Sequence, residues 1–397
     1  MTAATDSADP ILDRLPLFRE TAERSAEIVL ANLVALGEVP SPTFGEAARA
    51  SVFVERLSEF GLQNCSTDEM SNAYGVLPGS SGDRNILLVA NLDSFTEPEH
   101  PPPIEIRTDR IRGPFVGDNS LSLAAIASLP FLLDKLNLRL KANLVLMGAS
   151  RALGRGNLAG IKFFLDHGSL PVQAGLCLES VQLGRINFSS LGMLRGEIVC
   201  RLPDDYNWAQ FGASGTILPM SDIISRIAAI PLTRRPAGRI ILGSLRGGIS
   251  HQNIARQTTL GFEARSESAE VLGEIAEKIA DIVEEVAARA GVKVELDIFA
   301  RRSPGSLKIS DPLVRRAKSL LSSLGIEPML YPTTGALAAF LEKNIPALTL
   351  GISVGERKFD LAEIEELIDL QLVFTGLAQT IGMILAVDAF GSDENPA

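Results

Sequence analysis

The sequence predicts an α/β protein in which helices cover a mostly parallel sheet and a smaller βαββαβ domain is inserted. Three observations support this prediction. Strand and helix patterns alternate before residue 180 and again near the C-terminus, which is typical of a sheet with helical crossovers. The expected strands are apolar on both faces, as buried parallel strands are. A block with a different order of elements separates the two alternating parts.

The alternating part begins with two amphipathic helices, at residues 17–36 and roughly 46–60. Apolar residues recur in both with helical spacing, and Gly37 and Gly61 stop them. Buried strands and helices then follow in turn, and the pattern resumes after the inserted block. We expect strands at 85–91, 142–149, 174–180 and 346–353, and helices at 121–136, 156–168, 311–325 and 369–390.

The inserted block has the order β-α-β-β-α-β of a ferredoxin-like, split βαβ unit. Its second helix is well marked, because Leu272, Ile275 and Ile279 lie on one face and Gly291 ends it. The strands are expected at 196–202, 238–245, 258–266 and 292–300, and the helices at 217–230 and 269–291. The outer domain then comprises 1–192 plus 305–397, and the inserted domain 193–304.

Composition excludes several classes of protein. The 397 residues suggest two domains, and 46% hydrophobic residues can form a large core. The net charge of -11 argues against nucleic acid and against an anionic membrane as partners. The polar N-terminus does not resemble a signal peptide, and no uninterrupted apolar segment reaches membrane-spanning length. We expect a cytoplasmic protein with three reduced cysteines, of which Cys177 and Cys200 lie in the core.

A candidate site follows the first buried strand, which ends in Asn91-Leu92-Asp93. Asn91 and Asp93 point the same way on an extended chain, because they are two residues apart. Ligand sites of α/β proteins form at the carboxyl ends of such strands. These polar groups are therefore a working site, a degenerate one or an ordinary strand end.

Several stretches, in order along the chain, carry a resemblance to one family. They are LVALGEVPSPTFGE, NILLVANLDSF, GPFVGDNSLSLAAIASL, CLESVQLGRI, GSLRGGISHQNIA, LGFEARSES and IPALTLGIS. With the inserted domain they resemble the di-zinc amidohydrolases that include glutamate carboxypeptidase, aminoacylase, succinyl-diaminopimelate desuccinylase and tripeptide aminopeptidase, the M20 metallopeptidases. The resemblance covers nearly the whole chain. It implies a zinc-peptidase-like outer domain and a lid domain that commonly dimerises.

The family's chemistry uses two zinc ions that share an aspartate and generate a hydroxide nucleophile. A glutamate beside the metals acts as general base. By the resemblance, one metal takes a first histidine, the bridging aspartate and a later glutamate. The other takes the bridging aspartate, the second residue of a Glu-Glu pair and a C-terminal histidine.

This sequence keeps only part of that ligand set. Asn91 stands at the first histidine position, and Asp93, which would orient that histidine, is kept. Asp118 stands at the bridging position and Glu179 at the later glutamate. The Glu-Glu pair is missing, because no glutamate occurs between Glu105 and Glu179.

Other family positions also differ. The C-terminal histidine is missing, since no histidine follows His251, and Phe359 is the expected replacement. Gly335 stands where the family has an aspartate before the last strand. Tyr206, close to Trp208, stands near the lid histidine that steadies the oxyanion from a neighbouring subunit. The general base and most metal ligands are therefore expected to be lost.

The remaining donors predict no di-zinc centre and either no cofactor or one weakly bound divalent cation. Only Asp118 is left for the second metal. The first keeps Asp118 and Glu179 with the amide oxygen of Asn91, a set that suits Mg²⁺, Mn²⁺ or Ca²⁺ better than zinc. Asp93 and His251 are the candidate proton carriers if any catalysis remains.

Three residues of the inserted domain are candidate substrate-binding groups, namely Tyr206, Asn253 and Arg265. Arg265 matches a family arginine that can contact a substrate carboxylate, and Asn253 would hold the same ligand. Structural roles are the alternative. Arg265 could belong to an ion pair, Tyr206 could be an ordinary lid aromatic, and His251 a solvated loop residue.

The outer-domain candidates have structural interpretations as well. Asp118 precedes a helix, where aspartate is favoured as a cap or turn residue. Glu179 could pair with a basic residue such as Arg185. Asn91 could be a neutral, hydrogen-bonding replacement rather than a ligand.

Three functions follow from the sequence, and we favour the first. It is a non-catalytic pseudo-peptidase that acts as binder or subunit, as a lid-mediated homodimer or as a heterodimer with an active paralogue. The second is an active metal-dependent peptidase or amidohydrolase with a rebuilt site at Asp118 and Glu179. The third is a binder of a peptide or small carboxylate. No Ser-His-Asp order, nucleophilic-cysteine context or P-loop supports a different enzyme class.

Overall fold

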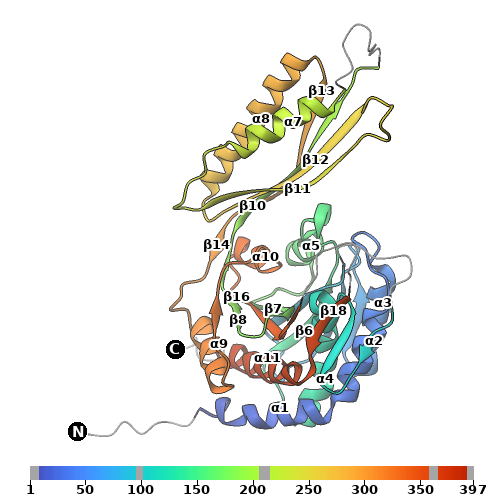
Figure 1. Ribbon diagram of the computed structural model, residues 1–397. Coiled ribbons are helices and arrows are strands. Elements are labelled where there is room, and N and C mark those ends of the chain that lie inside the picture. The colour runs from blue at the N-terminus through green and yellow to red at the C-terminus, as the bar shows by residue number, and fades with distance from the viewer. Residues whose placement is uncertain (1–8, 95–101, 205–214, 357–364, 391–397) are drawn as a thin grey trace, which may run out of the picture. The chain divides into compact units, whose positions relative to one another are not determined.

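The chain divides into two compact units in a computed structural model that describes residues 9–94, 102–204, 215–356 and 365–390 (Figure 1). Unit 1 comprises Met1–Ser189 and Ser306–Ala397, and unit 2 comprises Ser190–Gly305. The boundaries fall within β9 (Ser189–Ser190) and β14 (Gly305–Ser306). The sequence placed them after residues 192 and 304.

Unit 1 is built on an eight-stranded sheet of described strands, in the order β1-β2-β6-β3-β7-β16-β8-β15. Its centre is parallel, since β3 pairs in parallel with β6 and β7, and β7 with β16. This confirms the predicted mostly parallel sheet. The strands are β1 (Gln63–Thr67), β2 (Ala73–Leu77), β3 (Asn85–Asn91), β6 (Asn143–Ala149), β7 (Ala174–Val181), β8 (Arg185–Asn187), β15 (Met329–Leu330) and β16 (Ala347–Ser353).

A smaller antiparallel sheet flanks the main sheet. It comprises β4 (Glu105–Ile106), β5 (Arg110–Pro114), β17 (Gly355–Glu356) and β18 (Glu365–Asp369). The α-helices of unit 1 are α1 (Leu15–Arg24), α2 (Ala26–Gly37), α3 (Ala47–Glu59), α4 (Leu121–Lys135), α5 (Ala159–His167), α9 (Pro312–Ser323), α10 (Leu337–Glu342) and α11 (Leu370–Phe390).

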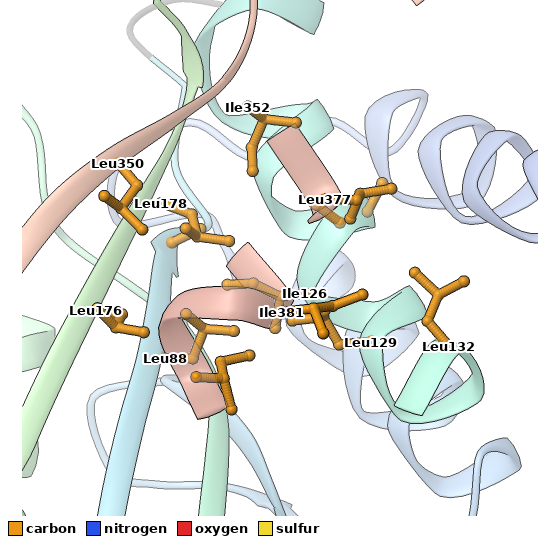
Figure 2. Packing of buried hydrophobic residues seen from close by; sticks show 14 of the residues in the cluster. Leu88, Ile126, Leu129, Leu132, Leu176, Leu178, Leu350, Ile352, Leu377 and Ile381 are labelled. Carbon is orange, nitrogen blue, oxygen red and sulfur yellow. The ribbon is translucent and has the colours of Figure 1, made fainter. Parts of the chain in front are cut away.

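One face of the main sheet is covered by two long apolar helices, α4 and α11. Figure 2 shows leucines of the central strands, among them Leu88, Leu178 and Leu350, beside Ile126 of α4 and Ile381 of α11. The alternate residues of β3, such as Val89, belong to a second cluster on the other face. Strands buried on both faces explain the continuous apolar runs in the sequence.

Helices α4 and α11 bear on the expectation that no uninterrupted apolar segment reaches membrane-spanning length. The segments Val116–Lys135 and Leu370–Phe390 are long and apolar enough to cross a membrane by length and composition. Both are more than four-fifths buried within the protein, as core helices are. Their apolar length therefore serves the core of unit 1.

Two helices replace the single helix expected at 17–36. Helix α1 ends and α2 begins at Ser25, which leaves helical geometry at φ -103° and ψ 18°. The apolar pattern continues across this break, because both helices bury residues in the same core. Periodicity alone therefore did not reveal it.

Unit 2 is an antiparallel sheet in the order β11-β12-β10-β13 with two helices on one face, as the predicted βαββαβ domain requires. Helix α8 starts at Ser268, whose side chain accepts a hydrogen bond from Val271 N, and ends at Gly291 with φ 62°. The elements are β10 (Gly192–Arg201), α7 (Ile217–Ala228), β11 (Gly238–Gly247), β12 (Gln257–Ser266), α8 (Ala269–Ala290) and β13 (Lys293–Arg302).

Candidate functional site

Asn91 and Glu179 lie on neighbouring strands at the carboxyl edge of the unit 1 sheet. The last registered pair of β3 and β7 is Val89 with Cys177, and each candidate follows two residues later. Glu179 is itself opposite Gly351 of β16. Both residues therefore lie at the edge that the sequence predicted.

Asp118 reaches the same edge on a five-residue π-helical segment, Val116–Ser120. The side chain of Asn119 donates to the Asp93 carbonyl at 2.6 Å, and Ser122 N donates to Ser180 Oγ at 3.1 Å. These bonds tie the segment to the ends of β3 and β7. Asp118 is not the cap of α4, because Ser120 occupies the N-cap position.

Glu179 forms an ion pair with Arg185 of β8. Arg185 also donates from Nε to the Tyr331 hydroxyl at 2.6 Å, and its guanidinium lies 5.3 Å from the centre of the Tyr331 ring. A Cβ added to Gly335 would lie 3.2 Å from Glu179 Oε1. The Glu179 carboxylate thus lies between the guanidinium of Arg185 and Gly335, where a larger residue would crowd it.

These groups do not fit a di-zinc centre. Among the residues that the structure describes, no three His, Cys, Asp or Glu side chains are grouped to hold a metal. Glu179 already has a guanidinium as its counter-ion. Asn91 Oδ1 is buried and accepts no hydrogen bond within the described ranges, but a single amide oxygen is a weak metal ligand.

Asp93 is fully buried and connects two loops. It accepts from Thr43 Oγ1 at 2.8 Å and from Leu153 N at 2.9 Å. Burial raises the pKa of Asp93 to about 6, against the lowering effect of these hydrogen bonds. This geometry makes Asp93 a positioning residue for the loops around Thr43 and Leu153.

Replacing Asp93 with asparagine should change how stability depends on pH. The raised pKa means that the folded state holds the proton more tightly than the unfolded chain. The tighter binding of this proton stabilises the folded state. That stabilisation is complete below the ordinary aspartate pKa of 3.8 and is lost as pH rises through about 6. Two pKa units correspond to about 3 kcal/mol. The natural protein loses this stability between pH 4 and pH 7, whereas Asp93→Asn does not. The free energy of unfolding of the variant, minus that of the natural protein, should therefore rise by roughly 3 kcal/mol over this pH range.

Urea unfolding across this pH range measures the difference directly. The exposed Asp83 is the control, because the Ser81 hydroxyl lowers its pKa. The free energy of unfolding of Asp83→Asn, minus that of the natural protein, should therefore fall rather than rise as the pH increases. A pH-independent difference for Asp93→Asn would contradict the prediction.

Two further buried charges at this edge were not found from the sequence. Glu46 accepts from Phe44 N at 3.0 Å and from Arg151 N at 2.7 Å. Arg49 donates to the carbonyls of Val39 and Leu92, at distances of 2.6–2.9 Å. Arg49 lies four residues before the buried Phe53 of α3, and this position on the apolar face was the available signal.

Arg265 of unit 2 lies in a cluster around Glu263. Glu263 pairs with Arg265 and with Arg195, whose Nε is 2.7 Å away. Burial would raise the pKa of Glu263, but the two guanidinium groups outweigh it and hold the pKa below its ordinary value. The structural alternative considered for Arg265, an ion pair, is therefore present.

Unit 2 does not bring Arg265 and Asn253 together. Arg265 is near the end of β12 that pairs with Gly192, whereas Asn253 lies in the loop before the other end of that strand. Eight residues of strand separate Gln257 from Arg265, roughly 26 Å. Asn253 donates to Ser250 Oγ at 2.7 Å, and the neighbouring His251 is exposed.

The other predicted site residues, Tyr206, Trp208 and Phe359, lie outside the described residues. The two cysteines expected in the core, Cys177 and Cys200, are buried. Burial raises the pKa of the Cys177 thiol to about 12 and that of Cys200 to about 11. Neither thiol has the lowered pKa of a nucleophile.

A comparison with protein-family models and one with curated proteins each found no match. Among solved structures, the dipeptidase Dug1p from Saccharomyces cerevisiae is similar with a TM-score of 0.77 and 11% identity, over 94% of this chain and 98% of that one. A tripeptidase from Staphylococcus aureus has a TM-score of 0.70 and 17% identity, over 91% and 98%. The M20 family metallo-carboxypeptidase Sso-CP2 from Sulfolobus solfataricus has a TM-score of 0.70 and 14% identity, over 91% and 99%. The chain therefore has the fold of the M20 metallopeptidases, as its sequence predicted.

Proposed function

We propose that this chain is a non-catalytic member of the M20 metallopeptidases, a pseudo-peptidase that acts as binder or subunit. The observation that carries the proposal is the ion pair of Glu179 with Arg185, supported by Tyr331. A metal ion binds a deprotonated carboxylate, and a guanidinium that is already paired with the carboxylate competes with the metal for its negative charge. Here a guanidinium of the same chain compensates it.

The missing general base points the same way. No glutamate occurs between Glu105 and Glu179, the interval in which the family has its Glu-Glu pair. Loss of a general base alone lowers a rate by about 10²–10⁴, and loss of the metals removes the means of making hydroxide at neutral pH. The edge then retains Asn91, Asp118 and Glu179 without the groups that carry the family's chemistry.

A second candidate is an active hydrolase with one rebuilt cation site. The observation in its favour is Asn91 Oδ1, which is buried and has no hydrogen-bond donor within the described ranges. A cation at this oxygen would be shared with Asp118 and Glu179, and it would have to displace Arg185. This candidate predicts a stoichiometric ion and metal-dependent turnover.

Metal analysis and an activity assay on the same samples separate the two candidates. The natural protein, incubated with Zn²⁺, Mn²⁺ or Mg²⁺ and desalted, should hold far less than one ion per chain and should not cleave dipeptides or N-acyl amino acids. Arg185→Ala should bind Mn²⁺ more tightly, because Glu179 is released. Arg139→Ala, which removes an exposed pair with Asp134, is the control and should change nothing.

One outcome would overturn the proposal. It is one tightly held ion per chain in the natural protein, together with turnover, both lost in Asp118→Ala. The binding partners and the cellular location of the protein are also proposed here. We expect a cytoplasmic homodimer, or a heterodimer with an active paralogue, and a peptide or small carboxylate as ligand.

A further inference from the structure

Helix α8 and strand β13 of unit 2 form the walls of an open groove with a volume of about 580 Å³. Helices α7 and α8 lie on one face of the sheet, and β13 is the last strand in its order (Figure 1). In the described part of unit 2, β13 pairs only with β10. The groove therefore lies at the edge of the sheet opposite β11.

The lining of the groove is apolar on the strand and small on the helix. Leu296 and Ile298 of β13 pack against the core of unit 2, yet both remain only half-buried. The helix contributes Gly273, Ala276 and Ala280, which recur on one face at spacings of three and four residues. Because these side chains are short, a second helix can approach α8 closely. The groove thus leaves apolar surface uncovered and has room for a helix beside it.

The rim of the groove on α8 is acidic. Glu277, Asp281 and Glu284 are exposed, and none of them forms an ion pair with a residue that the structure describes. The two cations of α8, Lys278 and Arg289, are already paired with other carboxylates. Like charges three and four residues apart destabilise a helix. A basic partner would therefore relieve the repulsion among these three carboxylates.

We propose that this groove binds a basic, amphipathic helix of a partner protein. The apolar face of that helix would cover Leu296 and Ile298, and its lysines or arginines would meet the three carboxylates of α8. Arg301, the cation in the lining, lies nearer the start of α8, because β13 runs back along the helix. The proposal concerns unit 2 alone and goes beyond the proposed function, so that a failure of one leaves the other standing. It also leaves the β11 edge available for the lid-mediated dimer proposed above.

Charge and geometry select this occupant over the others. A second copy docked groove to groove would bring the unpaired carboxylates of both copies together, and facing like charges are costly. The same carboxylates repel nucleic acid and anionic membranes. A strand added to β13 would continue the plane of the sheet below α8, whereas a docked helix lies level with α8 and reaches its carboxylates.

Fluorescence anisotropy with the full chain and labelled peptides tests the proposal. The helix from Gly273 to Glu284 is about 17 Å long, so a helical peptide of about 18 residues covers it. The probe has leucines at helical spacing on one face and lysines at all other positions. The natural protein should bind this lysine peptide at least about tenfold more tightly than the same peptide with glutamate in place of lysine.

Two exposed positions of α8 make the result specific. Glu277→Lys should weaken binding of the lysine peptide about tenfold and strengthen binding of the glutamate peptide. Ala280→Gln places a longer, neutral side chain in the groove and should also weaken binding of the lysine peptide about tenfold. The controls are Glu55→Lys and Ala48→Gln, the same changes at exposed positions of α3. They should leave both affinities unchanged.

A rearranged peptide separates a docked helix from an added strand. It has the composition of the lysine peptide, but leucine and lysine alternate as they do in a strand, and it should bind at least about tenfold more weakly. Equal or tighter binding of the rearranged peptide would mean that β13 accepts an added strand, which would overturn the proposed helix. Affinities that neither Glu277→Lys nor Ala280→Gln changes would show that the peptide binds elsewhere, which would overturn the proposed groove.

Discussion

Replacing Gly376 with alanine is expected to destabilise unit 1 by at least about 3 kcal/mol, the upper end of overpacking effects. Gly376 lies within α11, where the helix crosses β16. An added Cβ would lie 1.9 Å from the carbonyl oxygen of Ile352. Because that atom belongs to the main chain of a central strand, a side-chain rotation cannot remove the clash. Helix and sheet must separate instead.

Urea unfolding followed by circular dichroism measures the effect. The control is Gly273→Ala in α8, where an added Cβ meets none of the described atoms within 4 Å. Alanine there should stabilise the protein by about 0.5–1 kcal/mol, because it replaces glycine in an exposed helix. A Gly376→Ala variant as stable as the natural protein would show that the close approach of α11 to β16 is not required.

Replacing Arg49 with methionine should cost about 3–5 kcal/mol. The guanidinium is almost completely buried, and Nη1 donates to the Leu92 carbonyl at 2.9 Å and to Ser94 Oγ at 3.1 Å. Methionine keeps the apolar stem but leaves these oxygens and the Val39 carbonyl without their donors. Buried acceptors without donors carry the full cost of desolvation.

The same helix supplies the control for this prediction. Arg56 of α3 pairs with the exposed Glu59, and Arg56→Met should change stability by less than about 0.5 kcal/mol. Arg49→Lys keeps the charge but lacks the planar guanidinium that reaches the carbonyls of Val39 and Leu92 together. Its stability should therefore lie between that of the natural protein and that of Arg49→Met. Equal stabilities of Arg49→Met and Arg56→Met would disprove the role assigned to Arg49.

The fold could be predicted because its elements depend on patterns that a sequence displays directly. Strands buried on both faces give unbroken apolar runs, as in Asn85–Asn91, and α8 shows a helical stripe between Ser268 and Gly291. The break at Ser25 was missed because the apolar pattern continues across it. Patterns report the face that is buried, and they do not report where a helix changes direction.

The candidate site could be located but not assembled from the sequence. Asn91 and Glu179 were placed at one edge correctly, because parallel strands end together. The buried roles of Glu46 and Arg49 were missed, because a polar residue in a helical pattern gives no sign of partners far along the chain. The separation of Asn253 from Arg265 follows from the length of β12, because Asn253 lies in the loop before that strand and Arg265 lies near its far end.

The pairing of Glu179 with Arg185 has a consequence for how such a chain can evolve. A histidine at position 91 would gain little while the neighbouring carboxylate is already compensated by a guanidinium. Removal of Arg185 alone would leave a partly buried carboxylate without its counter-charge, which costs stability. Each change is neutral or harmful until the other is present, which is sign epistasis. Under the function proposed above, single mutations therefore cannot easily restore hydrolysis, and selection is free to act on what the surfaces of this scaffold bind.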